Sequence, residues 1–80
     1  MERMKKHDIE RAANILNKML ANAGALERVR PEGRYGYIGL DAYDLEGRCR
    51  RTVKTGLTKR AAVDYLDAMI EGISIFTRKS

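Results

Sequence analysis

The chain has 80 residues, a formal net charge of +5 at pH 7 and a pI near 9.7. Its one cysteine, Cys49, excludes a disulfide framework and favours a reducing compartment. No apolar run approaches the roughly 18 residues that a membrane span needs, and the charged N-terminus lacks the apolar stretch of a secretory signal. We therefore expect a single cytoplasmic domain over residues 1–80, with no membrane partner and with residues 1–7 disordered.

Most of the positive charge lies in the middle of the chain. Residues 34–60 carry a net charge of +4, whereas residues 1–33 carry +2 and residues 61–80 carry −1. Clustered positive charge is typical of proteins that bind polyanions, although it also serves solubility alone.

The first predicted element is a helix over residues 8–23, with Asp8 as its N-cap and Gly24 as its left-handed C-terminal residue. Its apolar residues recur at steps of three and four and form one stripe: Ile9, Ala12, Ala13, Leu16, Met19, Leu20 and Ala23.

Residues 24–34 predict a connector, because Pro31 and Gly33 interrupt regular structure. We expect Leu26 and Val29 to pack under the domain. An extended segment within "ERVR" is the alternative.

A β-hairpin follows, with strands over residues 35–43 and 48–55 and a four-residue turn, Asp44-Leu45-Glu46-Gly47. This loop length pairs Tyr43 with Arg48. One face then carries Ile38, Leu40 and Ala42 with Cys49, Arg51 and Val53, and the Arg51 head group extends past the core edge. The opposite face carries Tyr35, Tyr37, Asp41 and Tyr43 with Arg48, Arg50, Thr52 and Lys54.

The last element is a helix that begins after Thr58, its N-cap, and continues to about residue 75. Its apolar stripe is Ala62, Leu66, Met69, Ile70 and Ile73. A short strand over residues 73–77 is the alternative.

The predicted fold is therefore α+β, in the order α-β-β-α, with two amphipathic helices on one face of an antiparallel hairpin. A two-stranded sheet has two exposed edges and is rarely stable alone. We therefore predict a homodimer, formed either by edge pairing or by helix contact.

The polar face of the hairpin combines aromatic rings with cations. Single-stranded nucleic acid binds such surfaces by base stacking and phosphate contacts, and a two-stranded ribbon can enter a DNA major groove. The segment "TGLTKR" adds cations at a helix N-terminus, where a phosphate can be held. The candidate nucleic-acid-binding residues are Tyr37, Tyr43, Arg48, Arg50, Lys54, Lys59 and Arg60. An ordinary solvated strand face has the same composition.

The sequence predicts no catalytic site, no metal site and no cofactor. Cys49 has no histidine near it in the sequence, and His7 is the one histidine of the chain. Asp64, Asp67 and Glu71 share one helix face, which we interpret as a solvated acidic surface.

The stretch "RYGYIGLDAYDLEGRCRRTVKTGLTKRAAVDYLDAMIEGI" (residues 34–73) resembles small proteins of unknown function from phages, prophages and mobile elements. In their pattern a leading helix precedes a Tyr-Gly strand, a hairpin and a "TGLTKRE" helix start, and this chain has Ala61 at the usual Glu. The hairpin and final helix also resemble, more weakly, the AP2-like arm-binding domain of phage integrases. That domain has a third strand, which is not evident here, and it binds DNA through its sheet.

The leading hypothesis is a non-catalytic accessory protein of phage or mobile-element origin that binds nucleic acid through the hairpin's basic face. The alternative is a protein-interaction module that regulates or inhibits a host protein, with its charge steering it to that partner.

Overall fold

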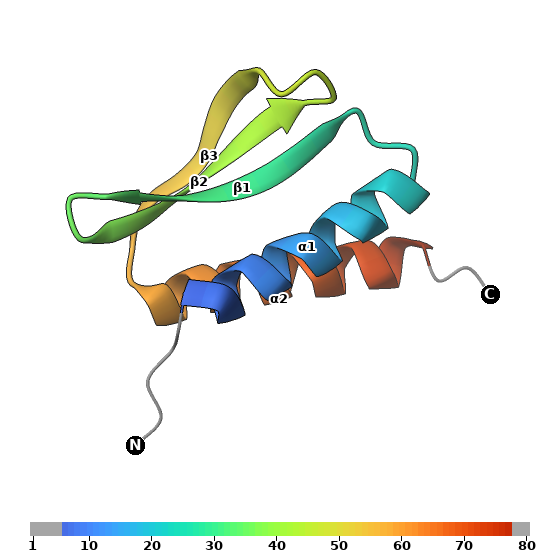
Figure 1. Ribbon diagram of the computed structural model, residues 1–80. Helices are drawn as coiled ribbons and strands as arrows, with labels where there is room; N and C mark the ends of the chain where they lie inside the picture. Colours follow the sequence, from blue (N-terminus) through green and yellow to red (C-terminus); the bar gives the residue numbers. More distant parts are fainter. Residues whose placement is uncertain (1–5, 78–80) are drawn as a thin grey trace.

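The computed structural model describes residues 6–77, and side chains from residue 8 to residue 75. The elements are α1 (Lys6–Asn22), β1 (Glu27–Arg34), β2 (Tyr37–Asp44), β3 (Cys49–Leu57) and α2 (Lys59–Thr77). The strands form one antiparallel sheet in the order β1-β2-β3, and both helices lie on the same face of it (Figure 1). The α+β fold, with a hairpin and two helices on one face, is confirmed.

A small core lies between the sheet and the helices. The predicted stripe of α1 buries four residues, Ile9, Ala12, Ala13 and Leu16, although Ala23 is exposed. Ala62 and Leu66 of α2 and Val29, Leu40 and Ala42 of the sheet complete the buried set. Neither helix, over the residues described, is long and apolar enough to cross a bilayer.

The helix ends follow the sequence signals, with one exception. Gly24 has a φ of +79°, and the N–H groups of Gly24 and Ala25 donate to the carbonyls of Ala21 and Leu20, which closes α1 with a Schellman motif. Thr58 is the N-cap of α2, since its Oγ1 accepts from the N–H of Ala61 at 3.1 Å. Asp8 is not an N-cap, because α1 begins at Lys6 and Asp8 lies within its first turn.

The structure also bears on the two ends of the chain, residues 1–7 and residues 73–77. Residues 6 and 7 of the predicted disordered segment belong to α1, and residues 1–5 lie outside the described residues. Residues 73–77 are helical, since α2 continues to Thr77.

The third strand, β1, occupies most of the segment predicted as a connector, so the alternative of an extended "ERVR" segment is confirmed. Tyr35 and Gly36 form a two-residue turn in which both have positive φ, 50° and 81°, and this turn pairs Arg34 with Tyr37. Val29 is buried opposite Ala42, as expected, but Leu26 is 75% exposed. Tyr35, predicted as a strand residue, lies instead at the tip of this turn.

The outer edge of β1 is closed by a side chain of α1. Asn17 Nδ2 donates to the carbonyl of Val29 at 2.9 Å, and the Val29 N–H donates to Asn17 Oδ1 at 2.8 Å. Alternate residues of an antiparallel strand direct their backbone groups to the same edge. Pro31, two residues after Val29, therefore also faces outward, where its missing N–H costs no bond to β2.

The β2–β3 hairpin has the predicted turn but a different register. Gly47 has a φ of +87°, and its N–H donates to the carbonyl of Asp44 at 3.0 Å. The N–H of Asp44 donates to the carbonyl of Arg48, so Tyr43 pairs with Cys49 and not with Arg48. A type I turn followed by a glycine bulge gives this arrangement.

Strand β3 is irregular along its length. Its register against β2 shifts at three places, between Ile38 and Leu40, between Leu40 and Asp41, and between Ala42 and Tyr43. Cys49 lies before these shifts: the turn pairs it with Tyr43 on the face away from the helices, where it is exposed, so its predicted place in the core is wrong. Arg51 pairs with Ala42 on the helix side and remains 63% exposed at its side chain, as predicted.

These edges bear on the predicted homodimer. Bulges twist an edge strand and interrupt its row of hydrogen-bonding groups. With Asn17 and Pro31 on the β1 edge and three register shifts in β3, both sheet edges are poor templates for a further strand. The homodimer stays a prediction. Because the edges disfavour edge pairing, contact between helices is the arrangement that we expect.

We predict that Asn17→Ala lowers the free energy of unfolding by about 1–3 kcal/mol, because it leaves the N–H and C=O of buried Val29 without partners. Chemical denaturation measures the change. Asn14→Ala is the matched control, because Asn14 is exposed on the same helix. Both variants gain the same helix propensity from replacing Asn by Ala, so their difference reports the lost hydrogen bonds. Equal stabilities of the two variants would show that the amide does not secure the edge.

Candidate functional site

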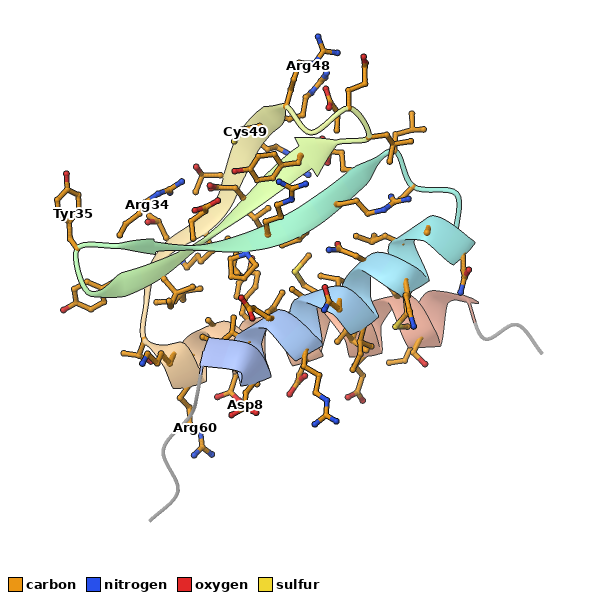
Figure 2. The ribbon with its side chains drawn as sticks, viewed as in Figure 1. Asp8, Arg34, Tyr35, Arg48, Cys49 and Arg60 are labelled. Carbon is orange, nitrogen blue, oxygen red and sulfur yellow. The ribbon has the colours of Figure 1, made fainter. Side chains whose placement is uncertain are left out.

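The sheet face away from the helices, called here the open face, is formed by alternate residues of β1 and β2. The register places Arg28, Arg30, Glu32 and Arg34 opposite Tyr43, Asp41, Gly39 and Tyr37. Cys49 and Thr52 of β3 pair with Tyr43 and Asp41 and extend the same face. Figure 2 shows Arg34 and Cys49 on this side of the ribbon, with the helices on the other side.

A first group on the open face surrounds Tyr43. The guanidinium carbon of Arg30 lies 4.7 Å from the centroid of the Tyr43 ring, which is a cation–π contact. The Tyr43 hydroxyl donates to Glu32 Oε1 at 3.2 Å. The pKa of Tyr43 is raised above its ordinary value of 10.0, mainly by desolvation and next by the hydrogen bond to Glu32.

A second group joins Arg34 to Asp41. Arg34 Nη2 donates to Asp41 Oδ2 as an ion pair, and Asp41 is 1% exposed although it lies on the open face. Among the residues described, Asp41 is the one buried charged side chain, and its Oδ1 has no hydrogen-bond partner. The pair therefore stands out from the exposed ion pairs elsewhere on the molecule.

The seven residues singled out from the sequence do not form one surface. Tyr37 and Tyr43 lie on the open face, where Tyr37 is 53% exposed and Tyr43 is half-buried. Lys54 is exposed in the irregular part of β3, opposite Leu40. Lys59 and Arg60 are exposed in the first turn of α2, and Arg60 points away from the sheet (Figure 2).

Arg48 lies at the tip of the β2–β3 hairpin and is held by local carboxylates. Its Nε is 3.1 Å from Asp44 Oδ2, and its Nη2 is 2.8 Å from Glu46 Oε1. Asp44 Oδ1 also accepts the N–H groups of Arg48 and Glu46 at 2.9 Å. The N–H of Arg48 is the main cause that lowers the pKa of Asp44 below 3.8, so this carboxylate remains charged and fixes the loop.

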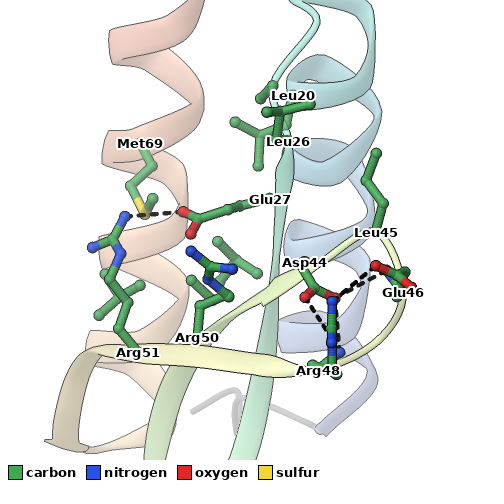
Figure 3. A pocket seen from close by; sticks show the side chains of 14 residues that line it. Leu20, Leu26, Glu27, Asp44, Leu45, Glu46, Arg48, Arg50, Arg51 and Met69 are labelled. Carbon is green, nitrogen blue, oxygen red and sulfur yellow. Dashed lines mark hydrogen bonds and ion pairs between the residues drawn. The ribbon is translucent and has the colours of Figure 1, made fainter.

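Arg50 lies in a groove of about 830 Å³ between the hairpin end, the start of β1 and the helices. Leu20, Val29, Ala42, Val53 and Met69 provide apolar lining. Arg51 Nη2 lies 3.1 Å from Glu27 Oε1 there, and the two side chains meet beside Arg50 (Figure 3). Arg50 is thus separated from the open face on which it was predicted, because the register shift between Ala42 and Tyr43 moves it.

Sequence reasoning missed Arg30 and Arg34, the arginines that the structure does place beside the tyrosines. The alternation in "ERVRPEGR" was the available signal, since every second residue from Arg28 is polar and Val29 is apolar. This alternation was overlooked because Pro31 and Gly33 were interpreted as residues that interrupt regular structure.

No protein-family model, curated protein or solved structure matches this chain. Within the part of the chain that the structure describes, no three His, Cys, Asp or Glu side chains lie together as metal ligands.

We predict that Glu32→Gln lowers the pKa of Tyr43 toward 10.0, because it removes the charge that favours the protonated hydroxyl. NMR titration of labelled tyrosine, assigned with Tyr43→Phe, measures it, and Glu46→Gln on the hairpin loop is the control. The raised folded-state pKa implies a stabilising contribution that is complete below pH 10.0 and is lost as the pH rises through the folded-state value. An unchanged Tyr43 pKa in Glu32→Gln would show that the hydrogen bond has no part in the shift.

Proposed function

We propose that this protein binds nucleic acid through the open face of its sheet and has no catalytic role. The observation that carries the proposal is a sheet face left uncovered by either helix, on which Arg30 and Arg34 lie among tyrosines (Figures 1 and 2). Guanidinium groups bind phosphates and base edges, and exposed aromatic rings stack on bases.

The residues proposed to contact nucleic acid are revised accordingly. Arg30, Arg34 and Tyr37 of the open face take first place, and Tyr43 supports Arg30. Lys54 is exposed, but it pairs with buried Leu40 on the helix side of the sheet, so it is left out of the contact set. Arg48, Arg50, Lys59 and Arg60 lie outside the open face and are not part of the proposed contact set.

Two further points support this proposal. The AP2-like arm-binding domain has a third strand that was not evident in the sequence of this chain. In the structure β1 is that additional strand, and the order is β1-β2-β3-α2. The resemblance of residues 34–73 to small phage and mobile-element proteins suggests an accessory role in that setting, in the cytoplasm. A homodimer in which the copies meet through their helices would leave the open face available.

We predict that Arg30→Gln reduces the magnitude of the salt slope, log Kobs against log[salt], by about 0.9 for a short duplex and about 0.7 for a single strand, the loss of one phosphate contact. Arg11→Gln is the matched control, since it removes the same charge from the exposed surface of α1. Fluorescence anisotropy with mixed-sequence probes measures both variants. Identical slopes for the two would place the contact elsewhere, and no binding of either probe by the wild-type protein would reject the function.

A second candidate function, regulation or inhibition of a host protein, would use another surface. Leu26 and Leu45, beside the groove, are 75% and 59% exposed, which favours contact with an apolar partner there. A nuclease-treated host lysate, passed over wild-type protein and over a Leu26→Glu, Leu45→Glu variant, separates the candidates. A partner lost only from this variant supports the second function, whereas equal recovery from both contradicts it.

A further inference from the structure

Arg34 differs from the other arginines of the open face in how it is held. Its Nη2 donates to buried Asp41, and the side chain of Arg34 is itself 41% exposed. A guanidinium has five N–H donors in a rigid plane. The structure gives the remaining donors of Arg34 no partner among the described residues, so part of the group is available to a ligand.

Gly39 makes this placement possible. A Cβ built on Gly39 would lie 3.0 Å from Arg34 Nη1 and 3.6 Å from both Arg34 Cζ and Thr55 Oγ1. The Arg34 guanidinium therefore lies across the backbone of β2 at a glycine, and a side chain there requires it to shift by a few tenths of an ångström or more.

The ion pair is a costly way to stabilise a small domain. A buried carboxylate with an unpartnered oxygen carries a desolvation penalty that a single partner repays only in part. Apolar residues of similar size often replace such pairs without loss of stability. The pair is better explained by what it does to Arg34, because it fixes the position of a donor array on an open surface.

The pairing also decides which contact suits Arg34. A nearby carboxylate offsets much of the arginine's charge, which weakens its attraction to a phosphate at a distance. It leaves the planar N–H donors in place, and their geometry is what a bidentate contact to a guanine edge requires. Arg30 covers the ring of Tyr43, so Tyr37 is left as the exposed strand tyrosine of the open face for stacking on an unpaired base, and this favours duplex over single-stranded nucleic acid.

We infer that Asp41 is a positioning residue that holds Arg34, over Gly39, to read the major-groove edge of a guanine in duplex DNA. This inference rests on the proposed nucleic-acid function of the open face. It assigns sequence preference to Arg34 and Asp41, whereas the salt dependence of binding belongs to Arg30.

The test enriches bound duplexes from a random-sequence library and compares the preferred motifs of three variants. Gly39→Ala shifts the guanidinium from its place over β2 but keeps its charge, and Arg34→Lys keeps the charge but removes the planar donors. Gly33→Ala is the matched control, because a Cβ there meets nothing within 4 Å. Circular dichroism and denaturation confirm that each variant is folded.

We predict that wild-type protein and Gly33→Ala enrich a motif with a G·C pair at one position. Gly39→Ala and Arg34→Lys should lose roughly ten-fold of that preference, the size of one bidentate contact, with an unchanged salt slope on a mixed duplex. An unchanged motif in both variants overturns the inference and leaves the proposed function standing. Retention of the preference in Arg34→Lys alone also overturns it, since the charge of Arg34 and not its planar donors would then set the preference. Failure of wild-type protein to bind any duplex or single strand overturns both proposals.

Discussion

The pairing of β1 with β2 is the constraint on which the rest of the structure depends. Its register, with Val29 opposite Ala42, directs one set of alternate residues into the core and the other set onto the open face. A shift of one residue would exchange these sets on β1. The two-residue turn at Tyr35 and Gly36 sets this register from one end, and Asn17 secures the strand from its outer edge.

The parts of the fold that local patterns determine could be predicted from the sequence. The apolar stripes of both helices, the cap at Thr58 and the turn at Gly24 depend on residues within a few positions of one another. The parity of β2 was also predictable, because Ile38, Leu40 and Ala42 are apolar and alternate with Gly39, Asp41 and Tyr43. The third strand was not recognised because it contains Pro31. Proline is acceptable in a strand where its nitrogen faces an open edge, and whether β1 is an edge strand depends on tertiary pairing.

Strand β3 shows why the candidate site was only partly predictable. Each bulge changes which residues share a face, and nothing in the alternation of "RCRRTVKTG" marks three of them. Arg50 consequently lies on the side opposite to the one predicted, and Cys49 does so because the turn pairs it with Tyr43. The ion pair of Arg34 with Asp41 joins residues on two strands, so it appears only once the β1–β2 register is known.

The arrangement of edges and faces limits how a partner can be recognised. A sheet with free edges can bind a peptide by adding a strand, where backbone groups supply the affinity. Here Asn17 occupies one edge and bulges interrupt the other, while the open face has no helix over it. A partner that binds this sheet would therefore contact side chains and little free backbone. The three arginines of β1 on that face are accompanied by Glu32 and Asp41, so their net charge is small and their fixed positions matter more than their number.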